Sequence, residues 1–261
     1  MNLRSYIAFL AVVTVLCMLV SCGGGVKETN EELLQGAIDA ASGPKADWQK
    51  ARALAFKAVK QKSEDANAHA ILALALEQCG QPDNAIDEVR KAVELDPKNF
   101  TAQYTKGRIL FVRDRIGDCV APLKEAQKLR PENANVVLLL ARSADKLGRF
   151  KEAAAYYATL ARHPAFKDRP EPYNELAMLY VRQNDNVKAS AFFNEAYKKA
   201  PTNHIVVLNI GIFCDVYLNN PAYAIKHYVK YQELTLSNRE LEPVRAKLKK
   251  RIEFLKQKYK I

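Results

Sequence analysis

The sequence predicts an all-α protein built as a stack of helix pairs. The first observation is an internal repeat, since the related segments ELDPKN, KLRPEN and KKAPTN occupy residues 94–99, 128–133 and 198–203. Their prolines are 34 residues apart in the first interval and 70 in the second, which is two periods with about two inserted residues. The second observation is that the 261 residues include only ten glycines, and long stretches contain neither Gly nor Pro. A fixed period with few helix breakers is typical of stacked helical units.

Residues 1–21 are typical of a signal peptide. Arg4 precedes an uncharged apolar run from Ile7 to Val20, about fourteen residues long. That is the length of a signal-peptide core, and it is shorter than the roughly 18 apolar residues expected of a transmembrane helix. The run ends in Leu19-Val20-Ser21-Cys22 rather than in an A-x-A-like cleavage site. This ending resembles the lipobox of bacterial lipoproteins.

The lipobox resemblance implies that the signal is cut before Cys22 and that the Cys22 thiol carries a covalent lipid such as palmitate. Residues 22–30, which include Gly23 to Gly25, then form a flexible tether. Because glycine and not aspartate follows Cys22, the resemblance implies an outer-membrane anchor facing the periplasm. Anchoring in the inner membrane is the alternative. A signal anchor with a chance cysteine remains the alternative.

Five units of about 34 residues follow when the chain is aligned on its prolines, and they begin near Ala66, Phe100, Ala134, Pro170 and His204. Each unit carries one small residue on its first helix and one on its second, so that the two helices can approach closely. These residues are Ala73, Gly107, Ala141, Ala177 and Gly211, then Ala85, Cys119, Ala153, Ala189 and Ala224. The second helix of the fifth unit is shifted by one residue. Residues 31–62 form a degenerate leading unit, whose first helix is cut short by Ser42-Gly43-Pro44 and whose second opens at Asp47.

This pattern resembles the tetratricopeptide repeat (TPR), which has an L-[GA]-x2-Y core on its first helix and A-x3-F-x2-A on its second. The resemblance covers residues 31–237 and implies a right-handed α-solenoid of about six helix-turn-helix units. Together with the lipobox, the architecture is similar to bacterial TPR lipoproteins of the type IV pilus pilotin and outer-membrane assembly classes.

Residues 238–261 are predicted to form a basic amphipathic helix that caps the open end of the stack. Its apolar residues recur at helical spacing: Leu241, Val244, Leu248, Ile252, Leu255 and Tyr259. The segment holds nine Lys or Arg against three Asp or Glu, a local charge of +6 in a chain of net charge +11. Most of the excess positive charge therefore belongs to one terminal segment.

The TPR resemblance implies that the first helices line a concave groove that binds a protein or peptide partner. The matching positions here are Tyr104, Arg108, Phe111, Arg142, Asp145, Lys146, Asn174, Glu175, Arg182, Asn209 and Asp215. Arginine can pair with carboxylates, asparagine can hydrogen-bond a peptide backbone, and Tyr or Phe can anchor apolar side chains.

The sequence shows no pattern typical of a catalytic site. It has no Gly-rich phosphate loop, G-x-S-x-G or H-E-x-x-H, and its four histidines fall in different units. Three cysteines follow the lipobox, namely Cys79, Cys119 and Cys214. We expect them to be small buried residues. The alternative is that two of them form one disulfide. We therefore predict no enzyme activity, no metal and no cofactor besides the lipid on Cys22.

The sequence thus predicts a membrane-anchored scaffold or adaptor in envelope, pilus or secretion assembly. One alternative is polyanion binding by residues 238–261, with anionic lipid or cell wall as ligand. No nucleic-acid partner is expected, because an exported protein would rarely meet one. Self-association through the last units or the terminal helix is a further alternative.

Overall fold

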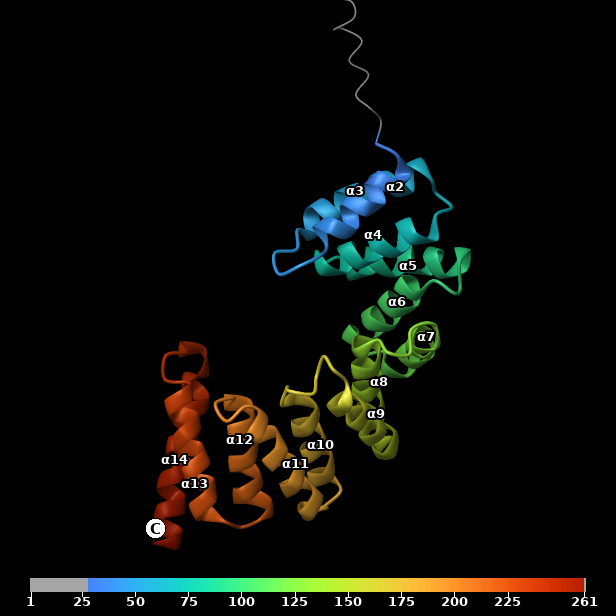
Figure 1. Ribbon diagram of the computed structural model, residues 1–261. Helices are drawn as coiled ribbons and strands as arrows, with labels where there is room; N and C mark the ends of the chain where they lie inside the picture. Colours follow the sequence, from blue (N-terminus) through green and yellow to red (C-terminus); the bar gives the residue numbers. More distant parts are fainter. Residues whose placement is uncertain (1–27, 261) are drawn as a thin grey trace, which may run out of the picture. The chain divides into compact units, whose positions relative to one another are not determined.

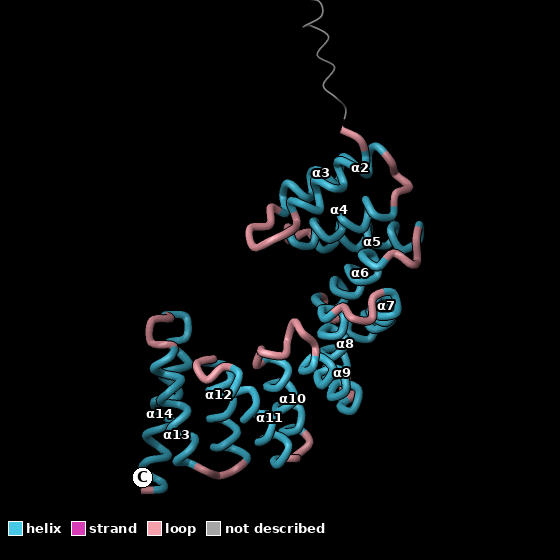
Figure 2. Tube along the Cα trace, in the orientation of Figure 1, coloured by secondary structure: helices cyan, strands magenta, loops and turns pink. Residues whose placement is uncertain are grey.

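The computed structural model describes residues 28–260, and all regular structure in that range is helical (Figures 1 and 2). The signal peptide, Cys22 and most of the tether lie outside the described residues. The chain divides into two compact units, residues 1–88 and 89–261. The boundary falls within helix α5 (Pro82–Leu95), so each unit is described by itself.

The first unit contains α2 (Asn30–Ala40), α3 (Trp48–Gln61), α4 (Ala66–Gln78) and the start of α5. Thr29 and Glu32 form a capping box at the start of α2. The helix ends just before the Ser42-Gly43-Pro44 break, as the sequence predicts. Asp47 caps α3 by accepting a hydrogen bond from the Lys50 backbone N–H at 2.9 Å. The three helices pack around a small apolar core.

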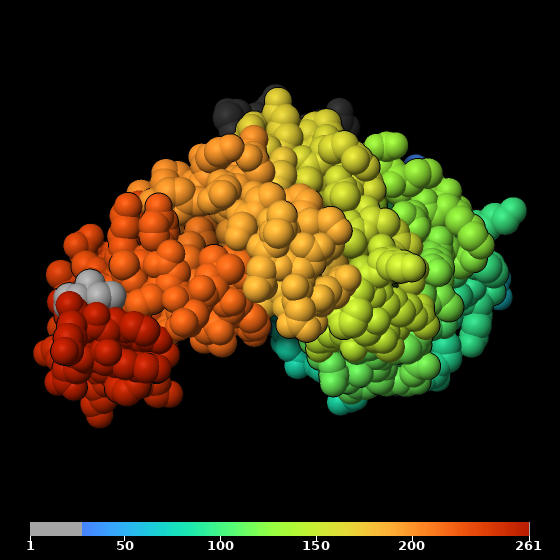
Figure 3. Space-filling view, turned by 90° about the horizontal axis from the view of Figure 1, so that it is seen from below, coloured from blue at the N-terminus to red at the C-terminus, as the bar shows by residue number. Residues whose placement is uncertain are grey.

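The second unit is a series of antiparallel helix pairs. In chain order its elements are α6 (Phe100–Val112), α7 (Ile116–Leu129), α8 (Ala134–Lys146), α9 (Phe150–Arg162), α10 (Glu171–Arg182), α11 (Asn186–Lys199), α12 (His204–Ile212), η1 (Phe213–Tyr217), α13 (Pro221–Leu234), η2 (Arg239–Leu241) and α14 (Glu242–Tyr259). Each first helix packs on the helix that follows it, and the pairs pack in sequence. In the space-filling view they form a continuous surface from green to red (Figure 3). This confirms the predicted α-solenoid.

The recurring proline-x-asparagine segment is a helix start signal. Its asparagines, Asn99, Asn133 and Asn203, precede α6, α8 and α12. Their side-chain oxygens accept the backbone N–H three residues on, at 3.0, 3.1 and 3.2 Å. Such a cap stabilises a helix by about 1 kcal/mol, because it satisfies a donor that has no partner within the helix. The motif recurs because every unit must start a new first helix.

A left-handed residue turns the chain between the two helices of each unit. In the compact unit formed by residues 89–261, the four repeats use one such residue each. In chain order these are Asp114 (φ 57°), Gly148 (69°), Asn184 (57°) and Asn219 (48°). Only Gly, Asn and Asp adopt this conformation routinely. Each of these turns therefore uses one of the residue types that reach it at low cost.

The small residues identified in the sequence lie where paired helices touch. A Cβ atom on Gly107 would lie 2.5 Å from the Leu123 Cγ atom, and one on Gly211 would lie 2.7 Å from Tyr228 Cδ1. Cys119 holds the equivalent place on α7 and is fully buried. All three described cysteines are unpaired, and burial raises the pKa of the Cys119 and Cys214 thiols. Their surroundings fit packing rather than thiol chemistry.

The one-residue shift in the fifth unit has a structural cause. Helix α12 continues into the π-helix η1, in which the Leu218 backbone N–H donates to the Phe213 carbonyl at 3.1 Å, five residues earlier. A π turn accommodates one more residue than an α turn. The extra residue is thus accommodated before α13 begins.

Helix α14 packs against α13 at the end of the second unit. Leu248, Ile252 and Leu255 enter the same core as Tyr228 and Tyr231. This is the predicted amphipathic C-terminal helix, with its apolar residues on the packed side.

Candidate partner-binding surface

In the compact unit formed by residues 89–261, a row of polar and aromatic side chains connects the first helices of successive repeats. Between α6 and α8, the Lys146 ammonium lies 2.7 Å from Asp114 Oδ1 and 5.4 Å from the centre of the Phe111 ring. The Asp114 side chain is well exposed, so this ion pair contributes little to stability. The contact instead places Lys146 and Phe111 side by side.

The same row continues from α8 to α12. Arg182 on α10 donates to the Asp145 carboxylate on α8. Asn209 on α12 donates from Nδ2 to Oδ1 of the buried Asn174 on α10 at 3.0 Å. The structure therefore brings six of the predicted groove residues into direct or stacked contacts across neighbouring first helices.

Two charged side chains in the middle of the row form no hydrogen bond and no ion pair at contact distance. Arg142 on α8 is exposed and Glu175 on α10 is partly buried. Neither makes a hydrogen bond or an ion pair with a described residue. Burial raises the pKa of the Glu175 carboxyl, the nearby Asp145 charge adds to this, and Arg142 and Arg182 oppose it. We call Arg142, Asp145, Glu175 and Arg182 the α8–α10 charge cluster.

The charge cluster lies near the buried phenol of Tyr157 on α9. Its side chain is 1% exposed, and burial raises the pKa of its hydroxyl. All four charges of the cluster act on that hydroxyl as well, the two carboxylates raising its pKa and the two arginines lowering it. The four charges therefore lie near one another and near the Tyr157 hydroxyl.

The predicted residues on α6 are partly buried. The Tyr104 ring stacks on the Phe100 ring with centres 5.9 Å apart, and the Arg130 guanidinium covers Phe100 at 4.1 Å. Arg108 lies one turn further along the same helix. These side chains form an aromatic and cationic end to the row.

Asp215 has a different role from the one predicted. Its carboxylate accepts two hydrogen bonds from Arg251 on α14, at 2.7 and 2.8 Å, and one from the Tyr228 hydroxyl at 2.9 Å. The side chain is only 5% exposed, and the Arg251 hydrogen bonds hold the pKa of the carboxyl below its ordinary range. Asp215 is thus occupied in attaching α14 and is not available to a partner.

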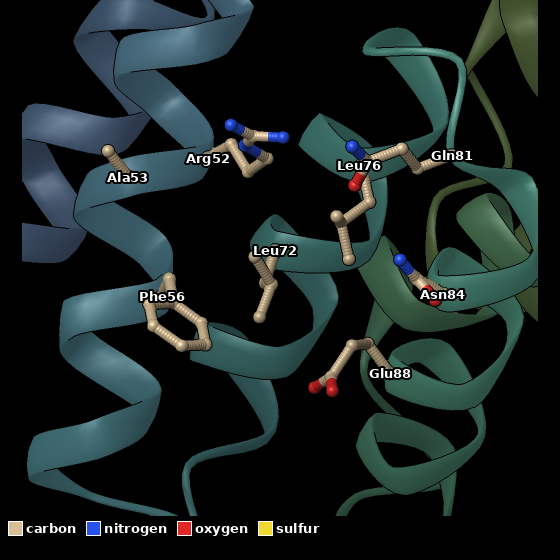
Figure 4. A pocket seen from close by; sticks show the side chains of 8 residues that line it. All are labelled: Arg52, Ala53, Phe56, Leu72, Leu76, Gln81, Asn84 and Glu88. Carbon is tan, nitrogen blue, oxygen red and sulfur yellow. The ribbon is translucent and has the colours of Figure 1, made fainter.

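The first unit contains a cavity that the sequence did not reveal (Figure 4). Its volume is about 510 Å³, and it is lined by Arg52, Ala53, Phe56, Leu72, Leu76, Gln81, Asn84 and Glu88. Phe56 is 49% exposed, and the Lys60 ammonium lies 4.7 Å from its ring centre. The sequence feature that could have pointed to this cavity is Phe56, an aromatic residue in the degenerate leading repeat. The repeat pattern assigns no role to that position.

The described residues contain neither a metal-binding cluster nor a membrane span. No group of three His, Cys, Asp or Glu side chains among them could hold a metal ion. No helix in the described part of the chain combines the length and apolarity needed to cross a membrane.

The family described as "T7SS, ESX-1 secretion system protein EccA1, N-terminal domain" matches residues 31–207. Among solved structures, the pilus biogenesis factor PilW is similar, with 21% identity and a TM-score of 0.69 over 82% of this chain and 97% of that one. PilF of Pseudomonas aeruginosa is 20% identical, with a TM-score of 0.66 over 84% and 97% of the two chains. YrrB, a TPR protein with an unusual peptide-binding site, is 21% identical, with a TM-score of 0.59 over 70% and 93%. No curated protein matches the sequence. At these identities the structures show that the fold is that of TPR proteins.

Proposed function

We propose that this chain, which belongs to the family of the EccA1 N-terminal domain, is a membrane-anchored scaffold that binds a protein partner along the first helices of its second unit. The observation that carries the proposal is the α8–α10 charge cluster. The Glu175 carboxylate and the Arg142 guanidinium form no ion pair at contact distance, and they lie next to the Arg182–Asp145 ion pair. Burial of the Glu175 carboxylate without a hydrogen bond lowers stability, so its presence favours a role in binding.

The chemistry of the row suits an extended polypeptide. Glu175 can accept backbone N–H groups or a lysine of the partner, and Arg142 can pair with a carboxylate. Asn174 and Asn209 bond each other through one donor and one acceptor, which leaves each amide with further hydrogen-bonding capacity. Phe111 offers an apolar contact at the α6 end. No step of this binding needs a cofactor or a catalytic group.

The proposed setting is the cell envelope. The lipobox at Leu19 to Cys22 supports a lipid anchor on Cys22 facing the periplasm. The family description names a secretion-system protein, and the PilW structure is that of a type IV pilus biogenesis factor. These names support a role in secretion or pilus assembly. The YrrB peptide-binding site supports a peptide-like ligand.

Substitutions in the charge cluster test the partner site. We expect Arg142→Glu and Glu175→Gln each to weaken partner binding at least about tenfold, because each removes a charged contact. The measurement is site-specific photocrosslinking in native membranes, followed by titration of the captured partner against purified variants. The matched control is Lys151→Glu, which changes an exposed lysine on the second helix α9.

Glu175→Gln also separates binding from folding. Because burial raises the pKa of Glu175, the folded state favours the protonated form, and stability falls as pH rises through that pKa. Glutamine removes this cost, so the variant should unfold at the same or a higher temperature than wild type at neutral pH. A partner that binds both cluster variants as tightly as wild type would place the site elsewhere.

Substitution of Cys22 tests the anchor. We expect Cys22→Ser to abolish attachment of the lipid, because serine cannot form the thioether, and to leave the signal peptide uncut, because the lipobox is lost and no A-x-A-like site replaces it. Labelling with a clickable fatty acid gives the direct readout, and Cys79→Ser serves as the matched control. Fatty-acid labelling of the Cys22→Ser protein as strong as that of wild type would contradict the proposal.

A further inference from the structure

The exposed side of α14 carries an unbalanced positive charge. Both of its arginines between Glu242 and Tyr259 are used internally, Arg245 with Glu242 and Arg251 with Asp215. None of its lysines makes an ion pair with a described residue, and neither does the adjoining Lys260. These six lysines are Lys247, Lys249, Lys250, Lys256, Lys258 and Lys260. The positive charge predicted from the sequence is therefore free to attract an external anion.

Three of the lysines share one helix face with an exposed aromatic ring. Lys247, Lys250, Phe254 and Lys258 follow one another at spacings of three, four and four residues, which aligns them along the helix. We call these four residues the basic stripe. Phe254 is 48% exposed. Its ring centre lies 5.1 Å from the Arg251 guanidinium and 5.8 Å from the Lys258 ammonium. Two carboxylates lie near the stripe: Glu253 does not share this spacing, and Asp215 is paired with Arg251 and is also attracted by Lys258.

The stripe points away from the packed side of the helix. Leu248, Ile252 and Leu255 face α13 and are buried. The space-filling view shows α14 at the outer end of the second unit (Figure 3). The helix is thus held rigidly by one face and by the Asp215–Arg251 ion pair, with the basic stripe turned to the outside.

We propose that the basic stripe docks this unit onto an anionic lipid surface. Clustered lysines on an amphipathic helix are attracted to anionic headgroups, and an aromatic ring between them can enter the headgroup layer. A soluble polyanion would neutralise the lysines equally well but would leave the Phe254 ring in water. The exposed ring at the centre of the stripe therefore favours a membrane over a dissolved polymer.

This contact is separate from the lipid anchor and from the partner site. It uses only residues of α14, and it would operate in a chain that carries no lipid. Its effect would be to fix a second point of the protein at the bilayer, at the opposite end of the sequence from Cys22.

Vesicle binding tests the proposal. The probe is the mature chain, residues 22–261, carrying Cys22→Ser, mixed with vesicles of phosphatidylcholine alone or with about a quarter phosphatidylglycerol. We expect co-sedimentation with the anionic vesicles only, and weaker binding at high salt because exposed charges are screened. Lys247→Gln/Lys250→Gln/Lys258→Gln should weaken this binding about 100-fold, and Phe254→Ala about fivefold.

A charge-matched control excludes a simple net-charge effect. Lys50 on α3, Lys151 on α9 and Lys167 in the turn after α9 are exposed and make no ion pair with a described residue. Changing these three to glutamine should reduce binding no more than about threefold, since the net charge changes equally but the stripe is intact. Circular dichroism confirms that each variant is folded.

Three results would overturn the proposal. The first is no binding to anionic vesicles by the parent chain. The second is equal loss of binding in the stripe variant and the control variant. The third is binding that polyphosphate abolishes and that Phe254→Ala leaves unchanged, which would assign the stripe to dissolved polyanions.

Discussion

Replacing Gly107 with valine should lower the free energy of unfolding by about 3 kcal/mol, the upper end of the cost of overpacking a core. A Cβ atom at this position would lie 2.5 and 2.6 Å from two carbons of Leu123. Leu123 is fully buried, so it has no open space into which to move. Helices α6 and α7 would have to separate, and the packing of that repeat would be lost. Urea unfolding followed by circular dichroism measures the effect.

Gly117 provides the matched control, because it lies one helix later in the same pair. Apart from the adjacent backbone of its own helix, no atom lies within 4 Å of a Cβ placed there. Gly117→Ala should therefore stabilise the protein by about 0.5–1 kcal/mol, through the better helix propensity of alanine. If Gly107→Val unfolded at the same urea concentration as wild type, α6 and α7 would not approach as closely as the structure shows.

Replacing Asp215 with asparagine should cost about 2 kcal/mol, in the range for hydrogen bonds to a charged group. The substitution keeps the shape of the side chain but removes the charge that holds Arg251. Because α14 is held at this point, limited proteolysis should also cut the turn around η2 faster in the variant. Lys249→Gln, on the same helix, is the control and should change neither measurement.

The effect of Asp215 should depend on pH with a defined sign. Its pKa is lower in the folded protein than in the unfolded chain, so its contribution is complete above the ordinary carboxyl value of 3.8 and is lost as pH falls below it. The stability difference between wild type and Asp215→Asn should be constant from neutral pH to about that value and then shrink. A difference that grew on acidification would show that Asp215 is not held as a carboxylate.

Repeat spacing predicted most of the fold because each repeat position has one structural role. The proline-x-asparagine segments located the starts of α6, α8 and α12, and the small residues located the helix contacts. The same logic failed at Asp215. Asp215 lies in the π-helix η1, and its carboxylate accepts hydrogen bonds from Arg251. Arg251 lies 36 residues later, and no local pattern connects it to Asp215.

The charge cluster could be predicted only in part. The sequence placed Arg142 and Glu175 on first helices, where the resemblance assigns the groove. It could not show that Arg182 would pair with Asp145 and leave the other two charges unpaired. Side-chain pairing of this kind depends on distances between neighbouring units, which a sequence period does not encode.

The asparagine caps have a consequence for how such a chain can change length. Each cap and the helix that it starts lie within a few consecutive residues, so a unit carries its own start signal wherever it is inserted. Gain or loss of one complete 34-residue unit would leave the remaining asparagine caps next to the helices that they start. A protein built this way can lengthen or shorten its binding surface in whole steps, each adding or removing one first helix.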